Sequence, residues 1–68
     1  MQLTINGKRQ RIAGDKWNLT QLLKVQQVQH PNTVLIQLNG EMVAGKNYEY
    51  TQLKDNDEVE ILYYLGGG

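Results

Sequence analysis

Three consecutive glycines, Gly66, Gly67 and Gly68, follow Leu65 at the end of the printed sequence. Glycine is costly to order and adds nothing to a hydrophobic core, so this run is expected to leave the fold and stay mobile. Four residues from Leu65 span roughly 13–14 Å when extended, and without Cβ atoms they can enter a channel too narrow for other residues. The chemistry on offer is that of a terminal carboxylate, which can be adenylated and then converted to a thiocarboxylate when a thiol or persulfide displaces AMP. The alternative is an unstructured end without function.

The rest of the chain offers little conventional catalytic chemistry. It contains no cysteine and no serine, so the usual nucleophile pairs cannot be assembled. The one histidine, His30, stands beside Pro31, where a helix is expected to end, and a histidine is common at that position. The acidic residues near Asp57 lack the spacing of a calcium loop and are interpreted as a turn. We therefore predict no catalytic residues, and no cofactor or metal bound by this chain.

Composition predicts one ordered domain whose stability comes from packing. The chain has 68 residues, of which 40% are hydrophobic and 21% charged, proportions typical of a folded domain rather than a disordered one. Without cysteine, neither disulfides nor a thiolate-bound metal can reinforce it. No apolar run is long enough to span a membrane, and the first residues do not resemble a signal peptide. We therefore expect a complete, cytoplasmic protein that does not bind membranes.

Charge is balanced overall but segregated along the chain. A formal net charge of zero argues against a general nucleic-acid binder. The basic group lies in the first third of the sequence and is expected to be solvated surface: Lys8, Arg9, Arg11, Lys16 and Lys24. The acidic group lies just before the tail: Asp55, Asp57, Glu58 and Glu60. An acidic surface beside the tail would orient a positively charged partner.

The first half of the chain predicts a hairpin and a helix. Residues 2–5 alternate polar and apolar, and Asn6-Gly7 favours a two-residue turn into a returning strand at 8–12. Asn18 can cap a helix, with Gln21 returning the bond as in a capping box. The apolar spacing that follows predicts a helix of about three turns, ended by His30-Pro31-Asn32.

The second half predicts three strands and two turns. The strands are expected at 34–38, 41–43 and 58–65. Asn39-Gly40 forms the turn between the first two strands. In Asp55-Asn56-Asp57, the middle residue can take a positive φ. Residues 44–53 are expected to be irregular, with Tyr48 and Leu53 as packing residues.

This order of elements predicts the α+β β-grasp fold, with residues 1–65 forming the domain and 66–68 a flexible tail. A mixed sheet of four to five strands would have the first and last strands paired at its centre and the helix across one face. The predicted core residues are Leu3, Ile5, Ile12, Leu19, Leu22, Leu23, Val34, Ile36, Leu38, Val43, Leu53, Val59 and Ile61.

The alternation of the last strand predicts an apolar patch on the open face of the sheet. If Val59, Ile61 and Tyr63 point inward, then Leu62 and Tyr64 point outward, and the same parity places Leu35 with them. Such a patch beside a reactive tail is typical of a partner-docking surface. Ordinary cross-strand pairs on a half-exposed sheet explain it equally well.

Several segments recur together in one known family. They are Met1-Gln2-Leu3 with Asn6-Gly7, Leu19-Thr20-Gln21-Leu22-Leu23, Leu38-Asn39-Gly40-Glu41-Met42-Val43, Asp55-Asn56-Asp57-Glu58-Val59-Glu60-Ile61, and Gly66-Gly67-Gly68. In this order and spacing, the whole chain resembles the ThiS family of small sulfur carriers in bacterial thiamin biosynthesis. The family's usual glycine in the acidic turn is replaced by Asn56, which tolerates the same backbone shape.

The resemblance implies a role for the tail and a set of partners. In the family the last two glycines are essential, so Gly68 is expected to carry the adenylate and then the thiocarboxylate. Gly67, and Gly66 at a variable position, would thread into the partner's active site. The implied partners are an E1-like adenylyltransferase of the ThiF type, a cysteine desulfurase relay and a thiazole synthase of the ThiG type. ATP and its metal would belong to the adenylyltransferase.

Other functions stay open from sequence alone. A carrier of the same fold can serve molybdopterin or cysteine and homocysteine assembly, although the length favours the thiamin type. A β-grasp binding module would not need the glycines, and an RNA-binding one would show a basic stripe that is missing here. A protein modifier joined to lysines through Gly68 is a third possibility.

Overall fold

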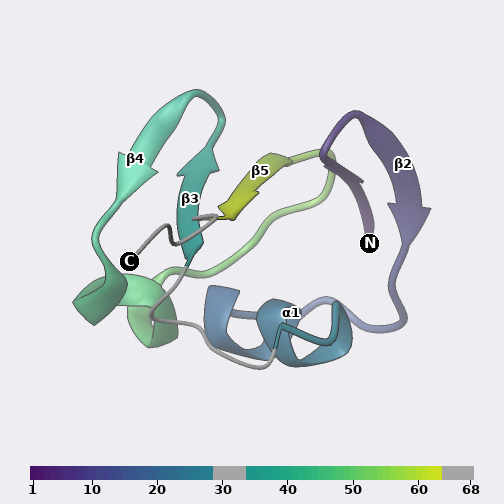
Figure 1. Ribbon diagram of the computed structural model, residues 1–68. Helices are drawn as coiled ribbons and strands as arrows, with labels where there is room; N and C mark the ends of the chain where they lie inside the picture. Colours follow the sequence, from purple (N-terminus) through teal and green to yellow (C-terminus); the bar gives the residue numbers. More distant parts are fainter. Residues whose placement is uncertain (29–33, 64–68) are drawn as a thin grey trace.

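The sheet is built from two antiparallel hairpins joined by the last strand, which lies between them (Figure 1). The computed structural model describes residues 1–28 and 34–63, and the strand order is β2-β1-β5-β3-β4. The elements are β1 (Gln2–Ile5), β2 (Lys8–Arg11), α1 (Leu19–Val25), β3 (Val34–Leu38), β4 (Glu41–Val43), the 3₁₀ helix η2 (Gly45–Tyr50) and β5 (Glu58–Tyr63). This is the predicted β-grasp arrangement. Residues 64 and 65, predicted to continue the last strand, lie outside the described residues.

Each hairpin turns on an Asn-Gly pair, as predicted. Asn6 and Gly7 have φ of 49° and 82°, and Asn39 and Gly40 have 53° and 85°. Positive φ at both central positions defines the type I′ turn, whose twist matches that of the flanking strands. These two local sequences therefore set the register of β1 with β2 and of β3 with β4.

The two ends of the domain meet in the middle of the sheet. β1 runs parallel to β5, with Ile5 opposite Val59, while β3 runs antiparallel to β5, with Ile36 opposite Ile61. The Thr4 N–H donates to the Asp57 carbonyl at 3.0 Å. β5 is thus an interior strand, and its residues Val59 and Ile61 are buried in the core.

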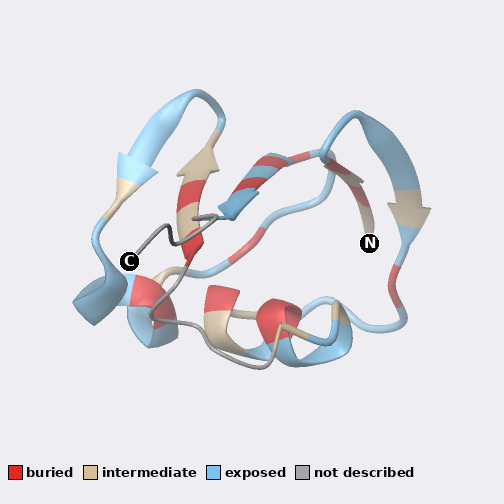
Figure 2. Ribbon diagram, in the orientation of Figure 1, coloured by how far each residue is buried: buried red, intermediate tan, exposed pale blue. Residues whose placement is uncertain are grey.

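The core lies between this sheet and α1 (Figure 2). Six residues are fully buried: Leu3, Leu19, Leu22, Leu23, Ile36 and Val59. Eleven of the thirteen predicted core residues are buried, while Leu38 and Val43 are only partly buried against the core. The expectation of an irregular segment at 44–53 was wrong for 45–50, where η2 buries Tyr48 and brings its hydroxyl within 3.4 Å of the Val34 carbonyl oxygen.

The helix begins as predicted but ends earlier. The Gln21 N–H donates to Asn18 Oδ1 at 2.8 Å, and the Asn18 N–H donates to Gln21 Oε1 at 3.0 Å, which completes the capping box. α1 then has seven residues instead of three turns. It ends because Gln27 takes a φ of 62°, so that the Val28 N–H donates to the Leu23 carbonyl at 2.9 Å, a Schellman motif. The predicted stop at His30-Pro31-Asn32 lies outside the described residues.

Replacing Gln27 with glycine is expected to stabilise the protein. Gln27 is exposed and in the left-handed region, where a Cβ costs roughly 1–2 kcal/mol and glycine costs less. After allowing for the greater freedom of glycine in the unfolded chain, Gln27→Gly should raise the free energy of unfolding by about 0.5–1 kcal/mol. Urea denaturation measures this change. Gln27→Ala is the matched control and should not stabilise; equal midpoints for the two variants would contradict the left-handed helix end.

Candidate functional site: the open sheet face and the strand that leads to the tail

The structure describes the strand that leads to the tail, not the tail itself. Gly66, Gly67 and Gly68 lie outside the described residues, as does Tyr64. β5 ends at Tyr63, five residues before the last residue of the sequence. Five residues reach at most about 17–18 Å when fully extended. Gly68 therefore lies no farther than this from the end of β5.

The asparagines of the two hairpin turns hold β5 from both sides. Asn6 Oδ1 accepts from the Ile61 N–H at 2.7 Å. Asn39 Oδ1 accepts from the Glu58 N–H at 2.9 Å, and Asn39 Nδ2 donates to Asp57 Oδ1 at 3.0 Å. Because backbone and side-chain bonds together anchor the strand, its end has a defined position relative to the sheet.

The predicted apolar pair on the open face does come together. Leu35 lies directly opposite Leu62 across β3 and β5, and cross-strand partners share a face of the sheet. Leu62 is 43% exposed, and Leu35 is half-buried. Met42, opposite Gln37 in the neighbouring pair and 54% exposed, extends this apolar surface onto β4. The sequence analysis did not include Met42 in this patch. Counting residues from the Asn39-Gly40 turn would have placed it on the same face of the sheet.

Tyr63 is not buried as the alternation predicted. It shares the helix-side face with Val59 and Ile61 but is 55% exposed. A helix of seven residues is only about 10 Å long, whereas a strand of six residues spans about 20 Å. α1 is therefore too short to cover the whole of β5.

The acidic group divides into two pairs with different roles. Asp57 is buried and accepts from the Lys54 N–H at 2.7 Å, and Asp55 accepts from the Gln2 N–H at 2.6 Å. These two carboxylates hold the turn before β5. Glu58 and Glu60 are exposed and, by their parity with Leu62, lie on the open face. Of the acidic group, only these two glutamates share the open face with Leu62. The predicted position beside the tail stays a prediction, because the tail lies outside the described residues.

The expectation that the basic group is solvated surface is correct for the arginines of β2, which are exposed. Arg9, across from Thr4, lies on the open face, where its Nη2 donates to Asn56 Oδ1 at 3.1 Å and to Gln2 Oε1. This arginine thus ties β2 to the acidic turn.

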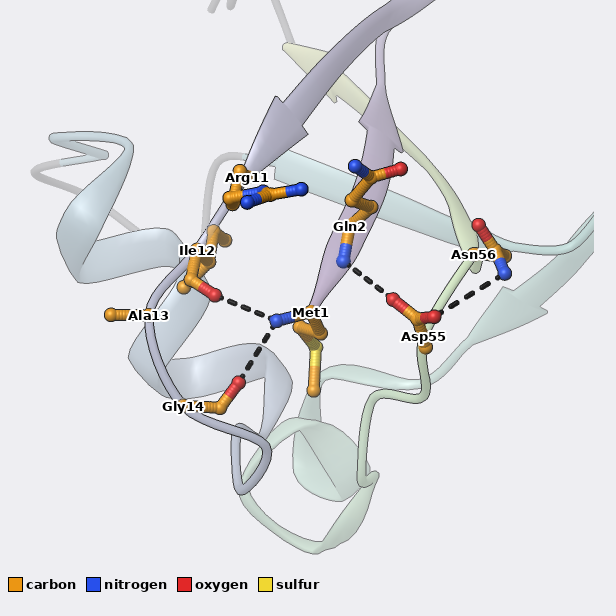
Figure 3. A pocket seen from close by; sticks show the side chains of 8 residues that line it. All are labelled: Met1, Gln2, Arg11, Ile12, Ala13, Gly14, Asp55 and Asn56. Atoms are coloured by element: carbon orange, nitrogen blue, oxygen red, sulfur yellow. Dashed lines mark hydrogen bonds between the residues drawn. The ribbon is translucent and has the colours of Figure 1, made fainter.

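A surface depression of about 530 Å³ lies beside the N-terminus, lined by residues that include Met1, Ala13 and Asp55 (Figure 3). The polar groups that line it already bond to one another. The Met1 ammonium donates to the carbonyls of Ile12 at 2.8 Å and Gly14 at 3.0 Å. Asp55 stands at the starting ends of the parallel strands β1 and β5, far from Tyr63. The residues that line this depression therefore stabilise the fold.

The described residues contain no metal-binding constellation. Within 1–28 and 34–63, no three or more histidine, cysteine, aspartate or glutamate side chains gather into a group able to hold a metal ion. No helix in this part of the chain is long and apolar enough to cross a membrane. The described part of the site thus consists of a strand anchored on both sides and an apolar sheet face that carries two exposed glutamates.

A mixed sheet in this strand order, with one helix packed against it, is the β-grasp plan of the ubiquitin-like proteins. A profile of the ThiS family matches residues 3–68, and this chain belongs to that family. It is 30% identical to the sulfur carrier protein ThiS of Bacillus subtilis (strain 168), over 97% of this chain and 98% of that protein.

Two solved structures from Geobacter metallireducens agree with this assignment. The crystal structure of the thiamine biosynthesis protein ThiS superposes with a TM-score of 0.87 and 39% identity over all of both chains. The solution structure of a thiamine biosynthesis protein gives 0.84 and 40% identity, over all of this chain and 88% of that one. The predicted fold and family resemblance are confirmed.

Proposed function

We propose that this chain is a sulfur carrier for thiamine biosynthesis, and that it carries sulfur as a thiocarboxylate on Gly68. The observation that carries the proposal is an interior strand, anchored on both sides, that ends at Tyr63 and is followed in the sequence by three glycines at positions 66–68. Membership of the ThiS family and the name of the Bacillus subtilis relative support it. The chain acts as a protein substrate, and its partners supply catalysis.

The chemistry needs only a carboxylate that a partner can reach. The Gly68 carboxylate attacks the α-phosphate of ATP and releases pyrophosphate, which leaves an acyl adenylate. A sulfur nucleophile then attacks the acyl carbon and AMP departs with the oxygen that bridged carbon to phosphorus. An E1-like adenylyltransferase would hold ATP and its metal, and a thiazole synthase would consume the thiocarboxylate. In this scheme the chain contributes the acyl group, a tail long enough to bring that group to the partner, and a surface that the partner recognises.

Intact mass spectrometry tests the proposal directly. The protein is incubated with a ThiS-activating adenylyltransferase, MgATP and sulfide as the simplest sulfur source. The expected product is heavier by the difference between one sulfur and one oxygen, and it forms only when ATP is present. An unchanged mass, in a reaction that converts a known ThiS protein, would overturn the proposal.

The same proposal includes a docking surface for the adenylyltransferase. Leu35, Leu62 and Met42 form its apolar centre, and Glu58 and Glu60 form its acidic border. Exposed apolar side chains bordered by two glutamates suit a partner whose surface is apolar at the centre and basic at the rim beside those glutamates. Burial of these side chains would give affinity, and the glutamates would orient the encounter.

Leu62→Glu is expected to weaken this docking while leaving the fold intact. A charge placed in the centre of a desolvated contact costs at least about 2 kcal/mol at such positions, so the KM for the carrier in adenylation should rise at least about thirtyfold. Pyrophosphate exchange measures the KM, and urea denaturation confirms folding. Tyr50→Glu is the matched control, because Tyr50 is 74% exposed on η2, which packs against α1 away from the open face. Equal KM values for the two variants would contradict the assignment.

A further inference from the structure

The two sides of β5 are paired to different lengths. In an antiparallel pair, successive residues direct their backbone groups alternately toward and away from the partner strand. The Asn39 N–H donates to the Glu58 carbonyl at 2.8 Å, which sets this parity for β5 against β3. The residues that bond toward β3 are therefore Glu58, Glu60 and Leu62. The residues that bond toward β1 are Val59, Ile61 and Tyr63.

The ladder on the β1 side stops before the strand does. The Asn6 N–H donates to the Val59 carbonyl at 2.9 Å, and the Ile61 N–H reaches Asn6 Oδ1 at 2.7 Å. After Asn6 the chain turns into β2, which pairs with the far edge of β1. Among the described residues, no strand lies opposite the Ile61 carbonyl or the Tyr63 N–H. These two groups form a short open edge at the C-terminal end of β5.

The other two edges of the sheet carry features that discourage pairing. The sequence of β2 is Lys8-Arg9-Gln10-Arg11, and β4 has only three residues and begins with Glu41. Charge and shortness are the common means by which edge strands avoid adding a further strand. The segment Ile61–Tyr63 has no charged residue, and Leu62 and Tyr63 are 43% and 55% exposed. It is therefore the edge best suited to strand addition.

We propose that this open edge binds an extended backbone segment of the adenylating partner, which adds one rung to the sheet beyond Asn6. The inference rests on the proposed function. An enzyme that acts on Gly68 must hold the chain close to Tyr63, and Leu62 already belongs to the docking surface, so the edge continues that surface. One donor and one acceptor are too few for a second copy of this chain, because stable dimers bury well over about 1,000 Å². When it is added to the larger docking surface, this rung would fix the direction of β5, the strand that leads to the tail.

Tyr63→Pro tests the edge, with Tyr63→Ala as its matched control. Proline removes the N–H that faces away from β3, so the β3–β5 ladder keeps all its donors. Both variants should unfold at similar urea concentrations. The KM for the carrier in pyrophosphate exchange should be about five- to tenfold higher for the proline variant than for the alanine variant, with kcat unchanged, as expected for loss of one backbone hydrogen bond.

Equal KM values for the two variants would overturn the inference. If the proline variant does not fold, a chemically synthesised chain with an N-methyl group on Tyr63 replaces it, and the unmethylated synthetic chain is its control. Sedimentation at rising concentration tests the other occupant: self-association that Tyr63→Pro abolishes would assign the edge to a second copy and overturn the proposal. The proposed function is tested separately, by whether the unmodified protein supports pyrophosphate exchange and whether that exchange requires Gly68.

Discussion

Deletion of Gly68 is expected to abolish adenylation and thiocarboxylate formation while leaving the fold unchanged. The deletion shortens the reach of the tail by about 3.3–3.6 Å, and an error of about 1 Å in the position of a reacting group can cost 10²-fold. We therefore expect the rate of pyrophosphate exchange to fall at least about 10²-fold. The anchors of β5 at Asn6 and Asn39 are untouched, so the urea midpoint should stay within error.

A second change in length sharpens this test. Appending one glycine after Gly68 keeps all native residues and moves the carboxylate outward by a similar distance. It should also lose adenylation, because the partner requires one position of the carboxylate and not merely a flexible end. Full exchange activity in the shortened chain would contradict the requirement for one position of the carboxylate.

Leu22→Ala is expected to cause the largest loss of stability. Leu22 has no exposed surface and packs on the helix side of the core. Leucine-to-alanine changes at such positions cost about 2–5 kcal/mol. A domain of this length has only about 3–10 kcal/mol of stability in all, at 0.05–0.15 kcal/mol per residue. The variant should therefore be partly unfolded at room temperature, as circular dichroism and urea denaturation will show.

The choice of alanine isolates packing from helix formation. Alanine is the best helix former, so the loss cannot be ascribed to helix propensity. Leu62→Ala is the control, since Leu62 is 43% exposed on the other face and should lose less than about 1 kcal/mol. Similar losses in the two variants would mean that α1 does not cover the sheet as described.

The parts of the fold that depend on local chemistry could be predicted from the sequence. Asn6-Gly7 and Asn39-Gly40 take the positive φ values that their turns require, and Asn18 with Gln21 forms the capping box. Each depends on residues within a few positions of one another. The central pairing of β1 with β5 could also be predicted, because the hairpin-helix-hairpin order leaves few sheets that satisfy the handedness of the connections.

The remaining features depend on geometry that residue types do not encode. Gln27 accepts a left-handed conformation because Val28 gains a backbone bond and a place against the core. Tyr63 has the correct parity for burial, but its exposure depends on how far a short helix extends. The open edge at the end of β5 appears only once the register of three strands is known. For the site, Leu35 and Leu62 were predicted from parity and confirmed as a pair, whereas the role of Gly68 stays a prediction.

The placement of β5 at the centre of the sheet has a consequence for biosynthesis. While residues 58–63 are still inside the ribosome, the emerging chain holds only two separate hairpins and a helix, and an isolated hairpin is at best marginally stable. Folding must therefore wait until residues 58–63 have left the ribosome. A product of premature termination before β5 cannot complete the core and is exposed to proteolysis. Every native molecule that a partner encounters has consequently been translated through the strand that precedes the glycines.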